Sequence, residues 1–172
     1  MIKEAKEFAH EKHSEQKRKT GEPYISHPER VARLVKKYKK SHKIDELVSA
    51  AWLHDTLEDT DTTEEDLKKL FGPLVSSLVK GLTSDKEEIE KSGKKNYLKE
   101  KMINMSNWAL VIKLADRLDN LSDEYLFYNP LFRKRYVSET KFILDGLEKE
   151  RKLSKTQEKL VKAIRKKLKE LE

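Results

Sequence analysis

A group of polar residues at the end of an apolar helix pattern constrains the fold more than any other feature. Apolar residues at three- and four-residue spacings predict a helix over about 43–57 with one buried face. His54, Asp55 and Glu58 continue that face. Because unpaired buried carboxylates are costly, such groups normally neutralise, pair or bind a cation. A plain helix end with a hydrogen-bonded core histidine is the simpler alternative, and Glu58 and Asp59 one turn later argue against it.

Composition favours a single all-helical domain over residues 1–172. Hydrophobic residues make up 36% and charged residues 40% of the 172 residues, glycine and proline are scarce, and few segments alternate as strands do. A chain of this length suits one domain with a substantial core. The lack of cysteine excludes thiolate ligands and suits a reducing cytosol, so we expect a cytoplasmic protein. Neither a signal peptide nor a membrane-spanning run is visible, so no membrane partner is expected.

The net charge of +7 is concentrated in the last segment. Residues 151–172 contain nine Lys or Arg and three Glu, whereas residues 1–150 are nearly neutral. A globally basic protein would suggest nucleic acid, but one basic helix is weaker evidence, so nucleic acid is not an expected partner. The oligomeric state is left open. An apolar stripe predicts that this helix packs on the body with its lysines in solvent: Leu153, Leu160, Ile164, Leu168 and Leu171.

The remaining helices follow from periodicity, capping and turn residues. The stretch TTEED (62–66) carries a capping-box pattern that starts a short helix, and Phe71-Gly72-Pro73 predicts the end of that helix. The polar stretch 84–95 is predicted to be a mobile loop with at most a helical turn. The other predicted helices span about 2–13, 27–35, 74–82, 96–105, 107–123, 131–150 and 154–171.

Three other segments add chemistry that matches the His54 stretch. Residues 16–25 form a cationic loop with a Gly/Pro turn, which alone is typical of a solvated loop. His27 precedes Pro28 at a helix start, where its imidazole can reach a neighbouring element. Asp116 lies where an apolar helix stripe turns acidic.

His27, His54, Asp55 and Asp116 are therefore the candidate metal ligands. Two imidazoles and two carboxylates form a mixed set that a divalent transition metal accepts and magnesium generally does not. Two anionic ligands also offset the charge of the ion. Four ligands leave positions open for water and a substrate phosphate in a six-coordinate shell.

The four ligands match the H…HD…D signature of the HD-domain phosphohydrolases. Three motifs resemble, more narrowly, the RelA/SpoT-type hydrolase domains, which degrade the guanosine alarmones ppGpp and pppGpp. The resemblance covers about residues 1–150 and implies an all-α HD-domain bundle of about eight to ten helices. Because the chain ends before the synthetase domain of the long members, it is similar to the stand-alone small alarmone hydrolases. The motifs are RKTGEPYISHP (18–28), HDTLEDT (54–60) and KLADRLDN (113–120).

The resemblance implies an enzyme that removes the 3′-pyrophosphate to give GDP or GTP plus pyrophosphate. It implies that one Mn(II) per chain is bound by the four candidate ligands, and that Glu58 or Asp59 orients the attacking water and takes its proton. Asp119 and Asp123 stand where many long members have histidine and threonine, which suggests a change in substrate fit. The implied contacts to the guanine nucleotide are Arg18, Lys19, Lys99 and Asn120.

Two alternatives remain open at this point. One is an HD-type phosphohydrolase of another nucleotide, such as NADPH or a deoxynucleotide; Arg18 and Lys19 favour the guanosine alarmone instead. The other is a non-catalytic module that senses nucleotides or binds nucleic acid and contains a structural metal. Glu58 and Asp59 argue against such a module, because binding alone would not need them. Phosphoryl transfer to another acceptor has no support, since no glycine-rich phosphate loop is present.

Overall fold

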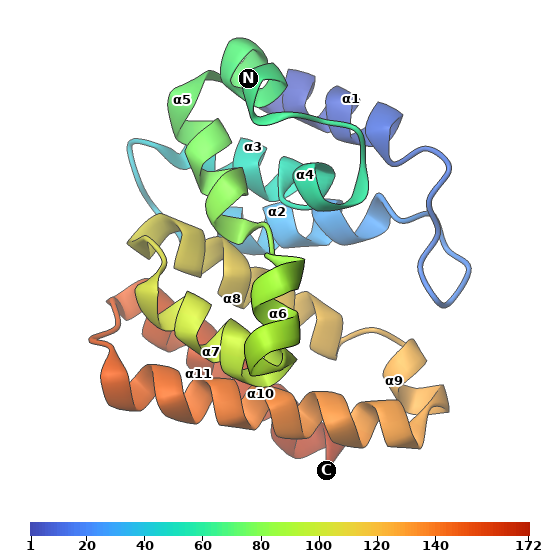
Figure 1. Ribbon diagram of the computed structural model, residues 1–172, viewed down its shortest axis with the longest axis vertical. Coiled ribbons are helices and arrows are strands. Elements are labelled where there is room, and N and C mark those ends of the chain that lie inside the picture. The colour runs from blue at the N-terminus through green and yellow to red at the C-terminus, as the bar shows by residue number, and fades with distance from the viewer. The chain divides into compact units, whose positions relative to one another are not determined.

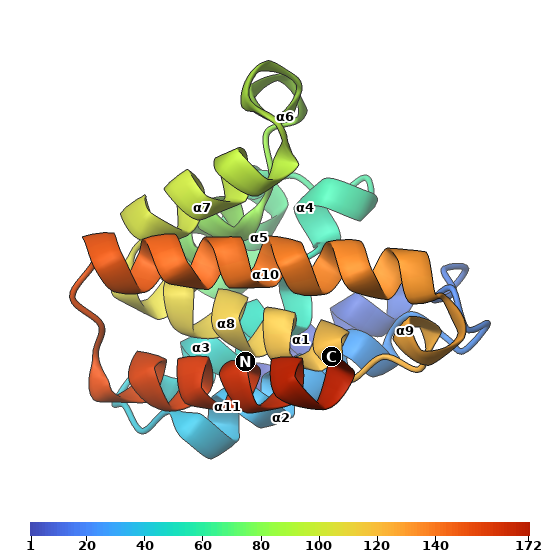
Figure 2. The same cartoon turned by 90° about the horizontal axis from the view of Figure 1, so that it is seen from below.

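Eleven helices and no β-strand make up the protein, seen here in a computed structural model that describes residues 1–172 (Figures 1 and 2). Two of the helices, α4 and α9, are only four residues long. The predicted all-α fold is confirmed. The chain divides into two compact units, Met1–Thr83 and Ser84–Glu172, which we describe separately. The single domain over 1–172 stays a prediction.

The N-terminal unit is built around α3, which packs against α1, α2 and α5 (Figure 1). Its central position follows from its composition, because the seven residues from Leu47 to Leu53 are all buried. A capping box between Thr63 and Asp66 starts α5, as predicted. The helices of this unit are α1 (Ile2–Lys12), α2 (Ser26–Tyr38), α3 (Ile44–Leu53), α4 (Thr56–Asp59) and α5 (Glu64–Leu82).

The C-terminal unit is built around α8 and α10. The final helix α11 packs against α8, and α10 contacts α7, α9 and α11 (Figure 2). The apolar stripe of α11 is buried from Leu160 to Leu171, with Leu153 half-buried, which confirms the predicted packing. The helices are α6 (Lys86–Ser92), α7 (Lys94–Asn104), α8 (Asn107–Leu121), α9 (Tyr125–Tyr128), α10 (Pro130–Glu150) and α11 (Lys155–Leu171).

Two predictions about local structure were wrong. The helix expected over 43–57 ends at Leu53, and a turn separates it from α4. The stretch 84–95, expected to be a loop, contains α6, because the Asp85 side chain accepts hydrogen bonds from the backbone N–H groups of Glu87 and Glu88. The interruption predicted at Gly72 is present as a kink: Gly72 has a φ of 85°, which favours glycine. None of the helices combines the length and the apolar character that crossing a membrane requires.

Candidate metal centre

The turn after α3 presents His54 and Asp55 together. The His54 Nδ1 atom lies 2.7 Å from the carbonyl oxygen of Ala51. Because a carbonyl oxygen only accepts, Nδ1 is the donor in this contact, and Nε2 is the ring atom that faces Asp55. Thr56 uses its hydroxyl in the same way, donating to the carbonyl of Leu53 at 2.8 Å. Side chains thus satisfy two carbonyls at the end of α3, and both metal-binding candidates leave the helix at its last turn.

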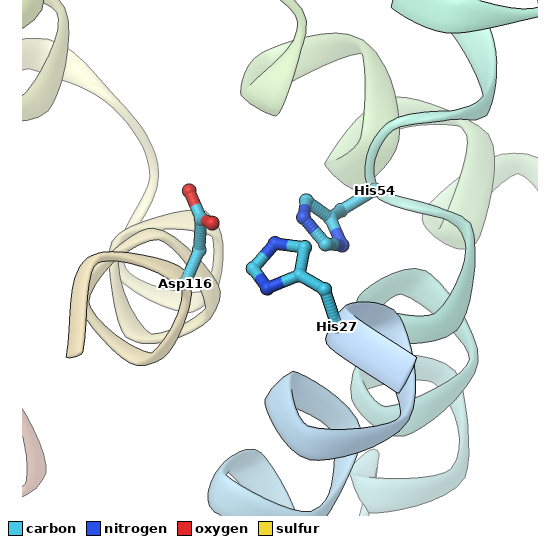
Figure 3. Close-up of side chains that lie close together, drawn as sticks. All are labelled: His27, His54 and Asp116. Atoms are coloured by element: carbon cyan, nitrogen blue, oxygen red, sulfur yellow. The ribbon is translucent and has the colours of Figure 1, made fainter. Parts of the chain in front are cut away.

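His27 lies near the start of α2 and faces this turn. The centroids of the His27 and His54 rings are 5.1 Å apart, and Figure 3 shows the two imidazoles side by side. The Asp55 Oδ2 atom is 3.0 Å from His54 Nε2 and 3.9 Å from His27 Nε2. Both histidines are buried, and the Asp55 side chain is 18% exposed. Three predicted ligands are therefore brought together within one unit.

These three side chains fit a cation. With Nδ1 donating to the Ala51 carbonyl, the Nε2 atom of His54 lies 3.0 Å from the Oδ2 atom of Asp55. That arrangement is favourable when a positive charge lies between or beside them. Imidazole nitrogen and carboxylate oxygen are also the donors that divalent transition metals accept. The donor set in this unit is thus consistent with the predicted metal.

The predicted water-activating residues follow directly on α4. Glu58 is half-buried and Asp59 is exposed. The backbone of α4 is tied to Asp55 by the hydrogen bond from Asp59 N to Asp55 O, 2.9 Å long. The side chain of Gln16 adds a second restraint, since its Nε2 donates to the carbonyl of Asp59 at 3.0 Å. Glu58 and Asp59 therefore lie on a restrained segment that directly follows the turn of His54 and Asp55.

The cationic loop folds back on itself as a short hairpin. Arg18 donates its backbone N–H to Glu22 O and accepts from Gly21 N, each at 2.9 Å. Gly21 has a φ of 90°, which explains why glycine stands at this turn. The Arg18 side chain is 8% exposed and its Nε lies 3.7 Å from Glu22 Oε1, whereas Lys19 is exposed. The two predicted nucleotide contacts thus differ: Arg18 is packed and Lys19 reaches solvent.

Asp116, the third side chain labelled in Figure 3, lies on α8 in the C-terminal unit. It is buried, and partners on its own helix hold both carboxylate oxygens. Lys113 Nζ is 2.8 Å from Oδ2, and the Asn120 amide donates to Oδ1 at 2.9 Å. Asn120, predicted to contact substrate, is therefore also placed to orient Asp116. The neighbouring Asp119 is buried too.

Two further residues with predicted roles make contacts inside the C-terminal unit. Lys99 on α7 lies against α10, with its Nζ 5.4 Å from the centroid of the Phe142 ring. The aliphatic part of its side chain fills the space that a side chain at Gly146 would need. Its Nζ also lies 3.2 Å from Glu100. Asp123 accepts a hydrogen bond from Tyr125 N at 2.9 Å and so shapes the turn into α9.

Sequence reasoning missed the residues that support the candidate ligands. Lys113 could have been found, because a lysine three residues before an aspartate on a helix pairs readily. The hydroxyl of Tyr24 donates to Asp55 Oδ2, and this contact could not have been found from the sequence, because the two residues are 31 positions apart. His13, expected to be a core or supporting residue, is buried with its Nδ1 2.6 Å from Gln16 Oε1. Burial lowers the pKa of His13 and so favours the neutral ring, and that hydrogen bond partly opposes the shift.

Comparisons with known proteins identify relatives of this chain. The sequence model of the HD domain matches residues 5–143. A guanosine-3′,5′-bis(diphosphate) 3′-pyrophosphohydrolase of Aquifex aeolicus is 45% identical over 148 residues, which are 81% of this chain and 20% of that protein. The chain thus spans about a fifth of that relative. The protein of the same description named MESH1 from Danio rerio is 42% identical over 129 residues, 72% of this chain and 68% of that protein.

A solved structure supports the same assignment. It is described as a metazoan ortholog of SpoT that hydrolyses ppGpp, and it matches with a TM-score of 0.77 at 32% identity. The match covers 96% of this chain and 94% of that one. Together with the HD domain match, these relatives show that the chain belongs to the HD-domain hydrolase family, in the branch of the RelA/SpoT-type guanosine-3′,5′-bis(diphosphate) 3′-pyrophosphohydrolases.

Proposed function

We propose that this protein hydrolyses the 3′-pyrophosphate of ppGpp and pppGpp, giving GDP or GTP plus pyrophosphate. The observation that carries the proposal is the meeting of the His27 and His54 imidazoles with Asp55, directly before the acidic segment α4. The Danio rerio relative and the SpoT ortholog are both described as hydrolases of this nucleotide.

We further propose that one Mn(II) binds to His27, His54, Asp55 and Asp116. His27, His54 and Asp116 are buried, and each offers one ligand atom. The Nε2 atom of His54 and the carboxylate oxygens are the kind of mixed donor set that such an ion prefers. His54 donates through Nδ1 to the Ala51 carbonyl, and Lys113 and Asn120 donate to Asp116; hydrogen bonds of this kind orient metal ligands.

The chain's own residues then divide the chemistry between them. A bound divalent ion lowers the pKa of water and polarises a phosphoryl oxygen. Glu58 or Asp59 would orient the attacking water and accept its proton as the water oxygen bonds to the phosphorus next to the 3′ oxygen. The bond from that phosphorus to the 3′ oxygen breaks, and the proton passes to the 3′ oxygen to leave a hydroxyl and free pyrophosphate. Arg18 and Lys19 lie in the cationic loop and offset charge on the nucleotide. Lys99 and Asn120 have the same proposed role in the C-terminal unit.

Product analysis tests this proposal directly. Purified protein is incubated with ppGpp, GTP or NADPH, each with Mn(II) and each with chelator, and the products are separated by ion-exchange chromatography. Release of GDP and pyrophosphate from ppGpp, dependent on Mn(II), is the expected result. Turnover of NADPH or GTP with ppGpp left intact would contradict the alarmone assignment and favour another nucleotide.

A pair of histidine variants ties the activity to the site. His54→Ala should abolish both metal binding and ppGpp hydrolysis, because it removes a ligand that the Ala51 carbonyl orients. His10→Ala is the matched control, since His10 is an exposed residue of α1. Equal losses in both variants would show that the effect of His54 is not specific. The cytoplasmic location stays a prediction.

A further inference from the structure

Tyr24 is the residue of the cationic loop that reaches the candidate ligands of the N-terminal unit. Its phenolic hydroxyl donates a hydrogen bond to Asp55 Oδ2. That same oxygen faces His54 Nε2 at 3.0 Å and His27 Nε2 at 3.9 Å. We infer that Tyr24 is a positioning residue that holds the Asp55 carboxylate toward the two imidazoles. This inference rests on the metal site of the proposed function.

The hydrogen bond is compatible with metal binding through the same oxygen. A carboxylate oxygen has two lone pairs, so Oδ2 can bind a cation with one and accept the phenol with the other. Asp55 lies in a turn between two helices and its side chain is 18% exposed, so packing alone restrains it less than a buried side chain. The phenol adds a restraint on the orientation of this carboxylate. Partners of this kind fix the orientation of a ligand and thereby raise metal affinity.

Tyr24 is itself held firmly on both sides. Its backbone N–H donates to Gln16 O at 2.9 Å, and its carbonyl accepts from His27 N at 3.0 Å. Its ring lies between the His13 ring, with centroids 5.0 Å apart, and the His27 ring, at 5.9 Å. The hydroxyl therefore approaches Asp55 from a fixed direction rather than from a mobile side chain.

A second connection joins the cationic loop to α4. Gln16 accepts from His13 Nδ1 through its Oε1 and donates through its Nε2 to the carbonyl of Asp59. The loop that carries Arg18 is thus bonded to the metal ligand through Tyr24 and to the acidic segment through Gln16. Loss of the phenol should loosen Asp55 while this second connection still holds the loop in place.

Tyr24→Phe tests the inference, because it removes the hydroxyl and keeps the ring that packs between two histidines. Mn(II) binding to chelator-treated protein is measured by titration calorimetry. We expect the Kd for Mn(II) to rise about 10–100-fold, the range found when a partner of a metal ligand is removed. The melting temperature of the metal-free protein should stay close to that of the wild type. A purely structural role would instead lower that temperature and leave the Kd of the folded protein unchanged.

Tyr38→Phe is the matched control, since Tyr38 lies at the end of α2 and is not among the residues around the site. Its Kd for Mn(II) should equal that of the wild type. An unchanged Kd in Tyr24→Phe, or an equal rise in Tyr38→Phe, would overturn the inference. A wild-type protein that binds Mn(II) but leaves ppGpp intact would refute the proposed activity alone, because the comparison of Kd values does not depend on turnover.

Discussion

Replacing Arg151 by alanine should destabilise the C-terminal unit, because this one side chain closes the end of α7. Its Nη1 lies 3.1 Å from Met102 O, 3.0 Å from Ile103 O and 2.5 Å from Met105 O. Its Nη2 donates to Asn107 Oδ1 at 2.8 Å, at the start of α8. The carbonyls at a helix C-terminus have no partner within the helix, so the guanidinium replaces water there and meets the negative end of the helix dipole.

The magnitude follows from this geometry. Nη1 carries two hydrogens, so it can make two good hydrogen bonds to the three carbonyls, and Nη2 makes a third bond. A bond from a charged donor contributes about 1.5–3 kcal/mol when buried, but Arg151 is only half-buried and water can replace part of it. We therefore expect the free energy of unfolding to fall by about 2–4 kcal/mol in Arg151→Ala. Arg151→Lys should lose less, because lysine keeps the charge but not the planar fork.

Urea unfolding followed by circular dichroism measures this change, with the slope of the transition compared between variants. Arg135→Ala is the matched control: Arg135 is exposed on α10, the helix that Arg151 follows, and its replacement should change the unfolding free energy by less than about 0.5 kcal/mol. A loss of less than about 0.5 kcal/mol in Arg151→Ala as well would refute the reasoning, since the carbonyls would then be equally satisfied by water.

Three other predictions concern the site. Glu58→Ala and Asp59→Ala should keep Mn(II) bound and lower kcat by about 10²–10⁴-fold. Calorimetry measures the metal binding, and a turnover assay measures kcat. Wild-type rates in the double variant would show that another group accepts the proton. Arg18→Ala should raise the KM for ppGpp by an amount equivalent to about 1–3 kcal/mol and leave hydrolysis of a small phosphodiester unchanged. An equal loss of activity on the two substrates would mean that Arg18 supports the fold or the metal instead. Burial lowers the pKa of His13 in the folded protein, so below about pH 6.5 the unfolded chain binds more protons at this residue than the folded protein does. The contribution of neutral His13 to the free energy of unfolding is therefore present above about pH 6.5 and is lost as the pH falls below that value. His13→Asn should therefore show a smaller loss of unfolding free energy between about pH 7.5 and about pH 5.5 than the wild type, and equal losses would contradict the assignment.

Local patterns were enough to predict most helices. The capping box of Thr63 and Asp66 involves atoms three residues apart, so the start of α5 is encoded in a short stretch. The buried stripe of α11 follows in the same way from the helical repeat. The ligand candidates His27, His54 and Asp55 were also visible, because polar residues that interrupt an apolar pattern stand out in sequence.

The sequence by itself determined the helical fold and the ligand candidates, because both depend on residue type and on spacing within a few turns. The end of α3 was decided by side chains that satisfy its last carbonyls, which a periodic pattern does not register. The place of Lys99 against Gly146 and the bond from Tyr24 to Asp55 join residues far apart in the chain. Such contacts depend on where helices pack, so only the tertiary structure could show which side chain supports the candidate ligand Asp55.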